Sequence, residues 1–175
     1  VFEKLIQRLQ TLMDQVDLSI EVIMVDDGSR DKTPVLMRLV SLQDDRFQSI
    51  FLSRNYGHQL ALTAGLSVVN ASEAIMVIDG DLQDPPELLI DFYSKIEEGF
   101  EVVYAVRRNR KESFLKKLAY KFYYRLQSRI TETEIPLDAG DFCMMSRRVV
   151  DVLNNMPEQS RFIRGMRAWI GFSQI

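Results

Sequence analysis

The sequence predicts an α/β domain whose central sheet is mostly parallel and is covered by helices on both faces. Two observations predict it: short apolar runs alternate with segments of helical periodicity, and the connections between them are short. The runs are mostly apolar, as is typical of strands in a sheet that is covered on both faces. The length of 175 residues is that of one domain, and 46% hydrophobic and 27% charged residues are typical of a globular chain with a real core.

Four helices are predicted from apolar residues that recur at every third or fourth position. The last of them has Pro86 in its first turn, where the missing N–H of proline costs nothing, and Gly99 just past its end. The predicted helices cover residues 2–13, 35–44, 58–69 and 86–98.

Four strands are predicted between the helices, from short apolar runs rich in β-branched residues. They cover residues 19–25, 47–53, 74–79 and 101–106. In a parallel sheet of this kind, ligands bind beyond the carboxyl ends of the strands. Charged or polar residues stand at all four of these ends, namely Asp26 with Asp27, Arg54 with Asn55, Asp79, and Arg107. The carboxyl edge of the sheet is therefore the predicted site.

Composition restricts the chemistry of that site. The chain has one Cys and one His, so it forms no internal disulfide and has no zinc-finger or iron–sulfur ligand set. A metal would have to be held by carboxylates, which favours Mg²⁺ or Mn²⁺. We assign Cys143, in the apolar run FCMM, to the core.

The charges are distributed unevenly. Residues 1–106 carry eight Lys or Arg and eighteen Asp or Glu, whereas residues 107–175 carry fourteen and seven. The two parts therefore predict surfaces with different partners, and the acidic part argues against a nucleic-acid partner.

Asp79, Gly80 and Asp81 form the most informative tripeptide, because two carboxylates directly follow a buried strand. Paired aspartates in such a turn suit a complex of a divalent metal with a diphosphate. The tripeptide alone fits an ordinary strand-to-loop turn equally well. Asp26 and Asp27 supply a second acidic strand end, of the kind that binds ribose hydroxyls in nucleotide folds. The alternative there is a capped turn into the next helix.

Four motifs stand in order along the chain: VDDGSRDKT, SRNYGHQLALTAG, IDGDLQDPPE and LDAGDFCMMSRR. Together they resemble the polyprenyl-phosphate glycosyltransferases of glycosyltransferase family 2, a group that includes dolichol-phosphate mannose synthase and the bactoprenol glucosyltransferases. The resemblance spans about residues 1–172 and implies a nucleotide-diphospho-sugar transferase (GT-A, Rossmann-like) fold. We expect residues 1–175 to be a single catalytic domain, and a fragment that lacks the family's first strand and any membrane region beyond residue 175.

The resemblance also implies a donor site. Asp27, with Asp26 behind it, would contact the base or ribose. Asp79 and Asp81 would approach the ribose and the metal-bound diphosphate, and they are the expected metal ligands. The rest of the implied nucleotide-sugar site comprises Gly57, Ala61, Gly80 and Gln83.

The acceptor side rests on the same resemblance. Asp141 aligns with the acid that acts on the acceptor, so Asp141 and Asp81 are the expected catalytic residues. Arg107 is the expected ligand of the acceptor phosphate, assisted by Lys116 or Lys117. The family often has Arg at the position of these lysines, and Arg binds phosphate better because its guanidinium can form two parallel hydrogen bonds. For His58 a capping or packing role is favoured over catalysis.

Residues 107–129 combine nine Lys or Arg with interleaved aromatics. Three interpretations are open: a solvated basic helix, an amphipathic helix at an anionic membrane surface, or a single-stranded nucleic-acid site. We favour membrane contact, because the acceptor of the resembling family is a membrane lipid phosphate.

The sequence-based hypothesis is an inverting transferase that moves a hexose from a nucleotide-diphospho-sugar to a polyprenyl phosphate at the cytoplasmic face of the membrane. UDP-glucose is the preferred donor, GDP-mannose stays open, and a homo-oligomer is compatible with the sequence. One alternative is a Mg²⁺-dependent aspartyl phosphohydrolase, which would leave the first and last motifs unused. The other is a peripheral membrane-binding module without activity.

Overall fold

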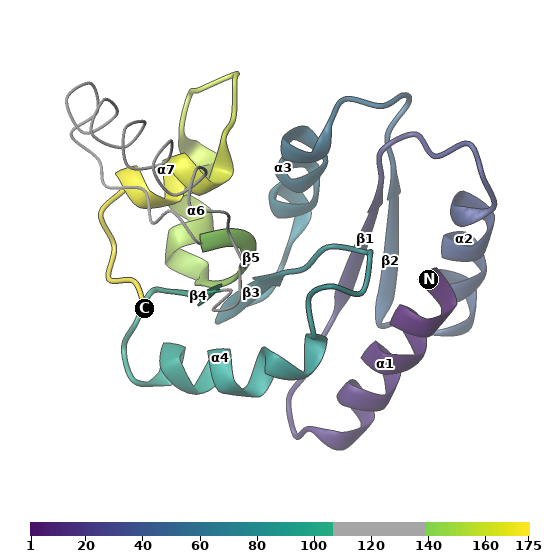
Figure 1. Ribbon diagram of the computed structural model, residues 1–175, viewed down its shortest axis with the longest axis horizontal. Coiled ribbons are helices and arrows are strands. Elements are labelled where there is room, and N and C mark those ends of the chain that lie inside the picture. Colours follow the sequence, from purple (N-terminus) through teal and green to yellow (C-terminus); the bar gives the residue numbers. More distant parts are fainter. Residues whose placement is uncertain (107–138) are drawn as a thin grey trace, which may run out of the picture.

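A computed structural model describes residues 1–106 and 139–175 (Figure 1). The predicted helix over 107–129, with Arg107, Lys116 and Lys117, lies outside these residues. The elements follow in the order α1 (Phe2–Gln15), β1 (Val22–Asp26), α2 (Thr33–Gln43), β2 (Phe47–Phe51), α3 (His58–Val68), β3 (Ala74–Val77), the 3₁₀ helix η1 (Pro86–Leu88), α4 (Leu89–Glu97), β4 (Val102–Val106), β5 (Ala139–Ser146), α6 (Arg147–Asn155) and α7 (Ile163–Trp169).

The helices and strands predicted within the described residues are all present, so the α/β class is confirmed. Strands β1 and β2 are parallel, with Val22 opposite Phe47 and Asp26 opposite Phe51. Figure 1 shows α1 and α2 on one side of this pair and α3 on the other. The only marked difference in a helix is at residues 86–98, where one 3₁₀ turn, η1, precedes α4.

The strand β5 was not predicted, and it changes the pairing in the second half of the fold. It lies between β3 and β4 and is antiparallel to both. Because both neighbours oppose β5, β3 and β4 run parallel to each other, as expected, but they are not hydrogen-bonded directly. The hydrogen-bonded ladders in this half of the fold are therefore antiparallel.

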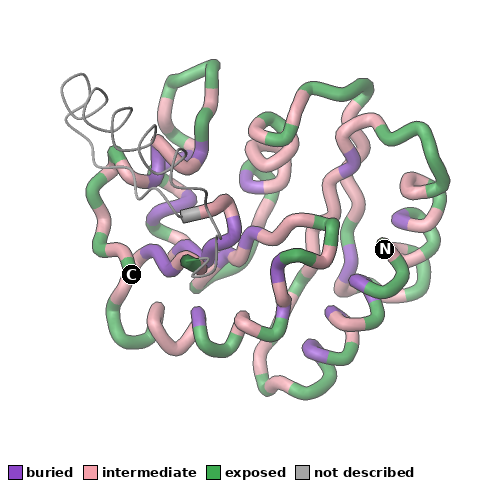
Figure 2. Tube along the Cα trace, viewed as in Figure 1, coloured by how far each residue is buried: buried purple, intermediate pink, exposed green. Residues whose placement is uncertain are grey.

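The main core surrounds β5. Met145, Val149 and Leu153 are fully buried there, and Cys143 is 1% exposed, so its predicted core position is confirmed. The helix α6 follows β5 directly because Ser146 caps it: its Oγ accepts a hydrogen bond of 3.3 Å from the Val149 N–H. Figure 2 shows buried residues along β5 and in the segments next to it.

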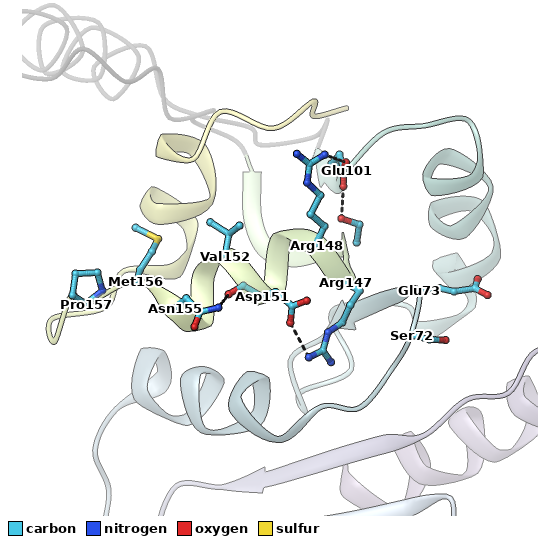
Figure 3. A pocket seen from close by; sticks show the side chains of 11 residues that line it. Ser72, Glu73, Glu101, Arg147, Arg148, Asp151, Val152, Asn155, Met156 and Pro157 are labelled. Atoms are coloured by element: carbon cyan, nitrogen blue, oxygen red, sulfur yellow. Dashed lines mark hydrogen bonds and ion pairs between the residues drawn. The ribbon is translucent and has the colours of Figure 1, made fainter.

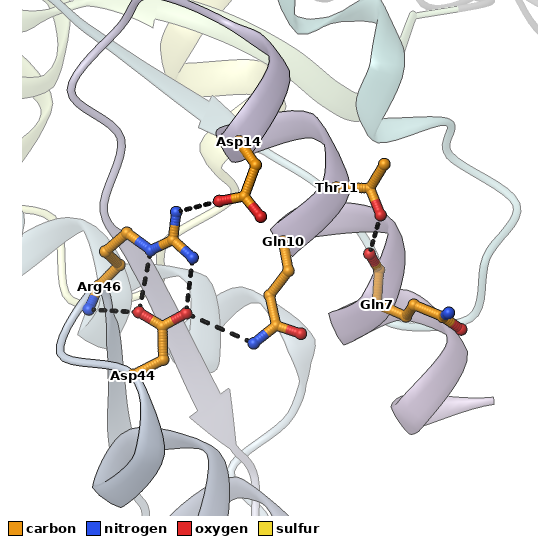
Figure 4. Close-up of polar contacts among 6 residues, drawn as sticks. All are labelled: Gln7, Gln10, Thr11, Asp14, Asp44 and Arg46. Atoms are coloured by element: carbon orange, nitrogen blue, oxygen red, sulfur yellow. Dashed lines mark hydrogen bonds and ion pairs between the residues drawn. The ribbon is translucent and has the colours of Figure 1, made fainter.

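A second core lies beneath α1, whose apolar face includes Leu5, Ile6 and Leu9 and packs on Phe47 of β2. A polar cluster ties the end of this helix to the start of β2 (Figure 4). Arg46 contacts Asp14 and Asp44, both at 2.8 Å. The Arg46 guanidinium, hydrogen-bonded to the carboxyl group of Asp44, lowers the pKa of that carboxyl to about 2.

A cavity of about 620 Å³ separates β1 from β3. Val22, Ile23 and Val25 of β1 and all four residues of β3 line it, so the two strands face each other across it. Among the described strands, β1 pairs only with β2, and β3 pairs only with β5. Within residues 1–106 and 139–175, no helix combines the length and the apolarity that are needed to cross a bilayer.

Candidate functional site

The strand ends bring the predicted acidic residues to one edge of the fold. Asp26 ends β1, and Asp79 follows the last residue of β3 by two positions. Because β5 is antiparallel to β3, the start of β5 lies beside the end of β3. Val77 is paired with Cys143, and two residues further out on each strand stand Asp79 and Asp141.

His58 lies between these two carboxylates. Its Nε2 is 3.1 Å from Asp141 Oδ2, and its Nδ1 is 3.9 Å from Asp79 Oδ1. His58 is the first residue of α3 and follows Gly57, whose φ of 92° is in the region that favours glycine. The imidazole is half-exposed, as is Asp79, whereas Asp141 is more enclosed. The structure therefore joins an expected metal ligand to the expected acceptor acid through a side chain that the sequence assigned to capping or packing.

Asp141 has a second partner on α3. The side-chain amide of Gln59 donates a hydrogen bond of 3.2 Å to Asp141 Oδ2. The other carboxylate oxygen, Oδ1, is buried and has no hydrogen-bond partner among residues 1–106 and 139–175. A buried oxygen without a partner is costly, so the position of Asp141 calls for a functional explanation.

Burial raises the pKa of the Asp79 carboxyl above its ordinary value, and the nearby His58 opposes the rise. The carboxylates of Asp84, Asp81 and Asp141 add to it. A cation bound beside Asp79 would offset this mutual repulsion. The carboxylate oxygens of Asp79 and Asp81 are the hard ligands that Mg²⁺ and Mn²⁺ prefer, so the residues present fit such a metal.

The turn after β3 is held by its own hydrogen bonds. Buried Asp84 accepts a hydrogen bond of 3.2 Å from the Asp79 N–H, and Asp81 accepts one of 2.9 Å from the Gln83 N–H. Leu82 has a φ of 68°, a conformation that is strained for a residue other than glycine. A Cβ on Gly80 would meet no atom within 4 Å, so the space beside Gly80 is open to a ligand.

No group of three or more His, Cys, Asp or Glu side chains in the described parts of the chain is arranged to hold a metal. Asp79 and Asp81 would therefore supply only part of a coordination shell, and oxygens of a bound diphosphate would have to supply more. This division suits a metal that binds together with its nucleotide.

At the other acidic strand end, both aspartates already have backbone partners. Asp27 accepts hydrogen bonds from the N–H groups of Tyr56 (2.7 Å) and Gly57 (2.8 Å). Asp26 is 5% exposed and accepts a hydrogen bond of 3.2 Å from the Ser29 N–H, so it is more enclosed than Asp27. The two hydrogen bonds to Asp27 hold the loop that precedes α3. The carboxylate of Asp27 still has lone pairs that could accept hydrogen bonds from a nucleotide.

Ala61 and Gln83 complete the expected donor residues. Ala61, one turn into α3, is half-buried and lines the cavity that reaches His58, Asp79 and Gly80. Gln83 is exposed on the turn that follows Asp81. The expected acceptor ligands Arg107, Lys116 and Lys117 lie outside the described residues.

A second pocket, of about 820 Å³, lies at the opposite ends of β3 and β5 (Figure 3). Its charged side chains contact one another: Arg147 pairs with Asp151 at 2.7 Å, and Arg148 lies 3.4 Å from Glu101. This pocket is separate from the edge that carries Asp79 and Asp141.

Sequence reasoning missed His58 and Gln59 as parts of the site. Both stand at the start of the helix after the second strand, at the same edge as the predicted acidic residues, and that position was the available signal. Their partner Asp141 lies more than eighty residues further on, so no local pattern reveals the contact.

The family model described as glycosyl transferase family 2 matches residues 2–153 of the chain. The chain belongs to this family. Membership confirms the family expected from the four motifs, and it favours transfer over the phosphohydrolase alternative.

Relatives of this family 2 chain include the uncharacterized glycosyltransferase YkcC of Bacillus subtilis (strain 168), 46% identical over 175 residues that cover 99% of this chain and 54% of YkcC. The bactoprenol glucosyl transferase of Shigella phage SfV is 32% identical over 172 residues, 98% of this chain and 55% of the phage protein. The chain thus spans about half the length of these relatives.

Among solved structures, the fold is similar to that of the mannosyltransferase PcManGT from Pyrobaculum calidifontis, in complex with GDP-Man and Mn²⁺. The TM-score is 0.63 at 18% identity, and the match covers 97% of this chain and 49% of the other. This likeness confirms the expected GT-A fold.

Proposed function

We propose that this family 2 chain is the catalytic domain of an inverting glycosyltransferase that moves a hexose from a nucleotide-diphospho-sugar to a polyprenyl phosphate. The observation that carries the proposal is the group formed by Asp79, His58 and Asp141. It sets the acidic turn expected to bind the donor beside the acid expected to face the acceptor, with distances of 3.9 and 3.1 Å through the imidazole. A sugar bound beside Asp79, at the carboxyl edge of the sheet, would have its reacting carbon close to Asp141.

The donor would lie along the carboxyl ends of β1 and β3. Asp27 would contact the base or ribose, with Gly57 and Ala61 beside the nucleotide and Gln83 near the sugar. Asp79 and Asp81 would bind Mg²⁺ or Mn²⁺, which would offset the charge of the diphosphate leaving group. Support comes from the carboxylate oxygens of these two residues, which are the hard ligands that such metals prefer.

The acceptor is proposed from the relatives, one of which is named a bactoprenol glucosyl transferase. An oxygen of the lipid phosphate would attack the anomeric carbon from the face opposite the leaving group. The new bond forms as the bond to the nucleoside diphosphate breaks, and the bonding pair leaves with the diphosphate. Arg107, helped by Lys116 or Lys117, would bind the acceptor phosphate.

Asp141 would orient the acceptor rather than remove a proton. A phosphate monoester with a second pKa of about 6 is largely ionised near neutral pH and needs little activation. The carboxylate would instead hold the position of a basic partner of the phosphate. Two further points are predictions from the sequence. The protein would act at the cytoplasmic face of an anionic membrane, and it could assemble into a homo-oligomer.

The test is a thermal-shift panel of UDP, GDP, CDP and ADP, each with Mn²⁺, with Mg²⁺ or with a chelator. A ligand that binds only the folded state stabilises it by mass action, by about 2.7 kcal/mol at one hundred times its Kd, and so raises the melting temperature. We expect UDP to give the largest metal-dependent rise. Transfer from UDP-glucose and from GDP-mannose to a polyprenyl phosphate is then measured on the full-length protein. Absence of transfer from every nucleotide-sugar would refute the proposal.

A further inference from the structure

We infer that Gln59 is a positioning residue that fixes the Asp141 carboxylate by joining it to the start of α7. The inference rests on the proposed function, in which Asp141 faces the acceptor. Gln59 lies on α3, Asp141 on β5 and Ile163 on α7, so one side chain connects three elements that are far apart in sequence.

The direction of the Gln59 amide follows from its two contacts. Its Oε1 accepts a hydrogen bond of 2.8 Å from the Ile163 N–H. Because an N–H must face the amide oxygen, the NH₂ group is left to face Asp141, where Nε2 donates over 3.2 Å. The two bonds therefore select one of the two orientations of the amide.

The contact with α7 replaces a missing cap. Ile163 is the first residue of α7, and the first N–H groups of a helix have no partner within it. The preceding residue, Phe162, provides no side-chain cap. Gln59 supplies the acceptor from outside the helix, so the position of its amide is tied to the packing of α7 on the core.

The contact with Asp141 restricts a torsion that is otherwise loose. The terminal χ2 torsion of an aspartate is broad, so the direction of its carboxylate depends on hydrogen bonds. Both partners described for Asp141, His58 and Gln59, bind the same oxygen, Oδ2. His58 is half-exposed and also faces Asp79, whereas Gln59 is held by α7. Gln59 therefore fixes the direction of the Asp141 carboxylate more strongly than His58 does.

The experiment compares Gln59→Glu with Gln59→Leu in the full-length protein. Gln59→Glu keeps an acceptor for the Ile163 N–H but turns a carboxylate oxygen toward Asp141, whereas Gln59→Leu loses both bonds. Gln43→Glu makes the same chemical change at an exposed position at the end of α2 and is the control. The measurements are hydrogen exchange at the Ile163 amide, nucleotide affinity, melting temperature, and kcat and KM for the acceptor.

We expect Gln59→Glu to keep the exchange rate of the Ile163 amide and the nucleotide affinity of the wild type. Its kcat should fall by up to about tenfold, because a misplaced Asp141 carboxylate no longer orients the acceptor correctly. Gln59→Leu should also speed the exchange of Ile163. Wild-type kcat in Gln59→Glu, or unchanged Ile163 exchange in Gln59→Leu, would overturn the inference. A wild type that transfers no sugar would instead defeat the proposed function, and the exchange measurement alone would then decide whether Gln59 holds α7.

Discussion

Asp27 accepts a hydrogen bond of 2.8 Å from the backbone N–H of Gly57, thirty residues further along the chain. The bond connects the end of β1 to the residue that precedes α3, and the Tyr56 N–H reinforces it at 2.7 Å. The loop that delivers His58 and Gln59 to the site is therefore shaped by an acid that the sequence assigned to nucleotide binding. The two roles are compatible, because a carboxylate accepts more than two hydrogen bonds.

Gly28→Ala should destabilise the domain by disturbing this loop. Gly28 has a φ of 74°, and a Cβ there would lie 2.7 Å from Arg54 C and Asn55 N, both backbone atoms. The left-handed conformation alone costs a residue with a side chain about 1–2 kcal/mol, and the clash adds to that. Since 1 kcal/mol shifts the melting temperature of a domain this size by about 2–4 °C, the left-handed conformation alone predicts a loss of about 2–8 °C, and the clash increases it.

Gly99→Ala is the matched control for Gly28→Ala, because Gly99 also has a positive φ but nothing lies within 4 Å of its Cβ position. Calorimetric melting should show the smaller loss for Gly99→Ala. Equal losses would mean that the close approach of Arg54 and Asn55 has no energetic weight.

Asp81→Asn should abolish metal-dependent nucleotide binding and leave the fold intact. Asp81 is exposed on the turn after β3, and substitutions at such positions usually change stability by less than about 0.5 kcal/mol. The measurement is calorimetric titration with UDP in the presence of Mn²⁺. Asp45→Asn, at an exposed position far from the turn, should bind as the wild type does. Unchanged affinity in Asp81→Asn would remove the metal assignment.

Asp141→Asn should lower kcat by about tenfold and leave nucleotide affinity unchanged. General-base catalysis typically contributes 10²–10⁴-fold, so an orienting role predicts a loss below that range. Steady-state kinetics with the polyprenyl phosphate acceptor provide the measurement. A loss of about 10³-fold or more would identify Asp141 as a base and contradict the orienting role.

Asp44→Asn should reduce stability near neutral pH, and the reduction should fade as the pH falls from about 4 to about 2. The pKa of Asp44 is held at about 2 by Arg46, below its ordinary value of 3.8. A lowered pKa in the folded state stabilises the fold once the unfolded carboxyl is ionised, and this contribution is lost as the pH falls from about 4 to 2. Melting curves of wild type and Asp44→Asn should therefore differ near pH 6 and converge at pH 2. A difference in melting temperature that stays constant from pH 6 to pH 2 would show that the ion pair between Asp44 and Arg46 does not cause the difference.

The edge of the sheet that carries the site could be predicted because strand ends are local features. Asp27 and Asp79 each follow an apolar run. In a parallel sheet the carboxyl ends of the strands lie at the same edge, so such residues are expected to lie close together there. The strand β5 could not be predicted in the same way. Its first residues, Ala139 to Asp141, include no long apolar side chain, and its place between β3 and β4 is decided by pairing with strands distant in sequence.

The partners of Asp141 could not be predicted for the same reason. Gln59 and His58 lie more than eighty residues before it, and Ile163 lies more than one hundred residues after Gln59. A single sequence contains no signal for contacts at such separations. The helix pattern of α3 therefore indicated a start near residue 58 without indicating what the first two side chains would touch.

The cavity between β1 and β3 has a consequence for how this 175-residue chain behaves at high concentration. Each strand offers that space a row of backbone N–H and C=O groups that no described strand pairs with. Residues 22–25 of β1 keep partial exposure to water, and β1 contains none of the Lys or Pro residues that usually protect a strand edge. Such an edge is a template for intermolecular sheet, so self-association through added strands is the expected hazard of preparing this chain in isolation.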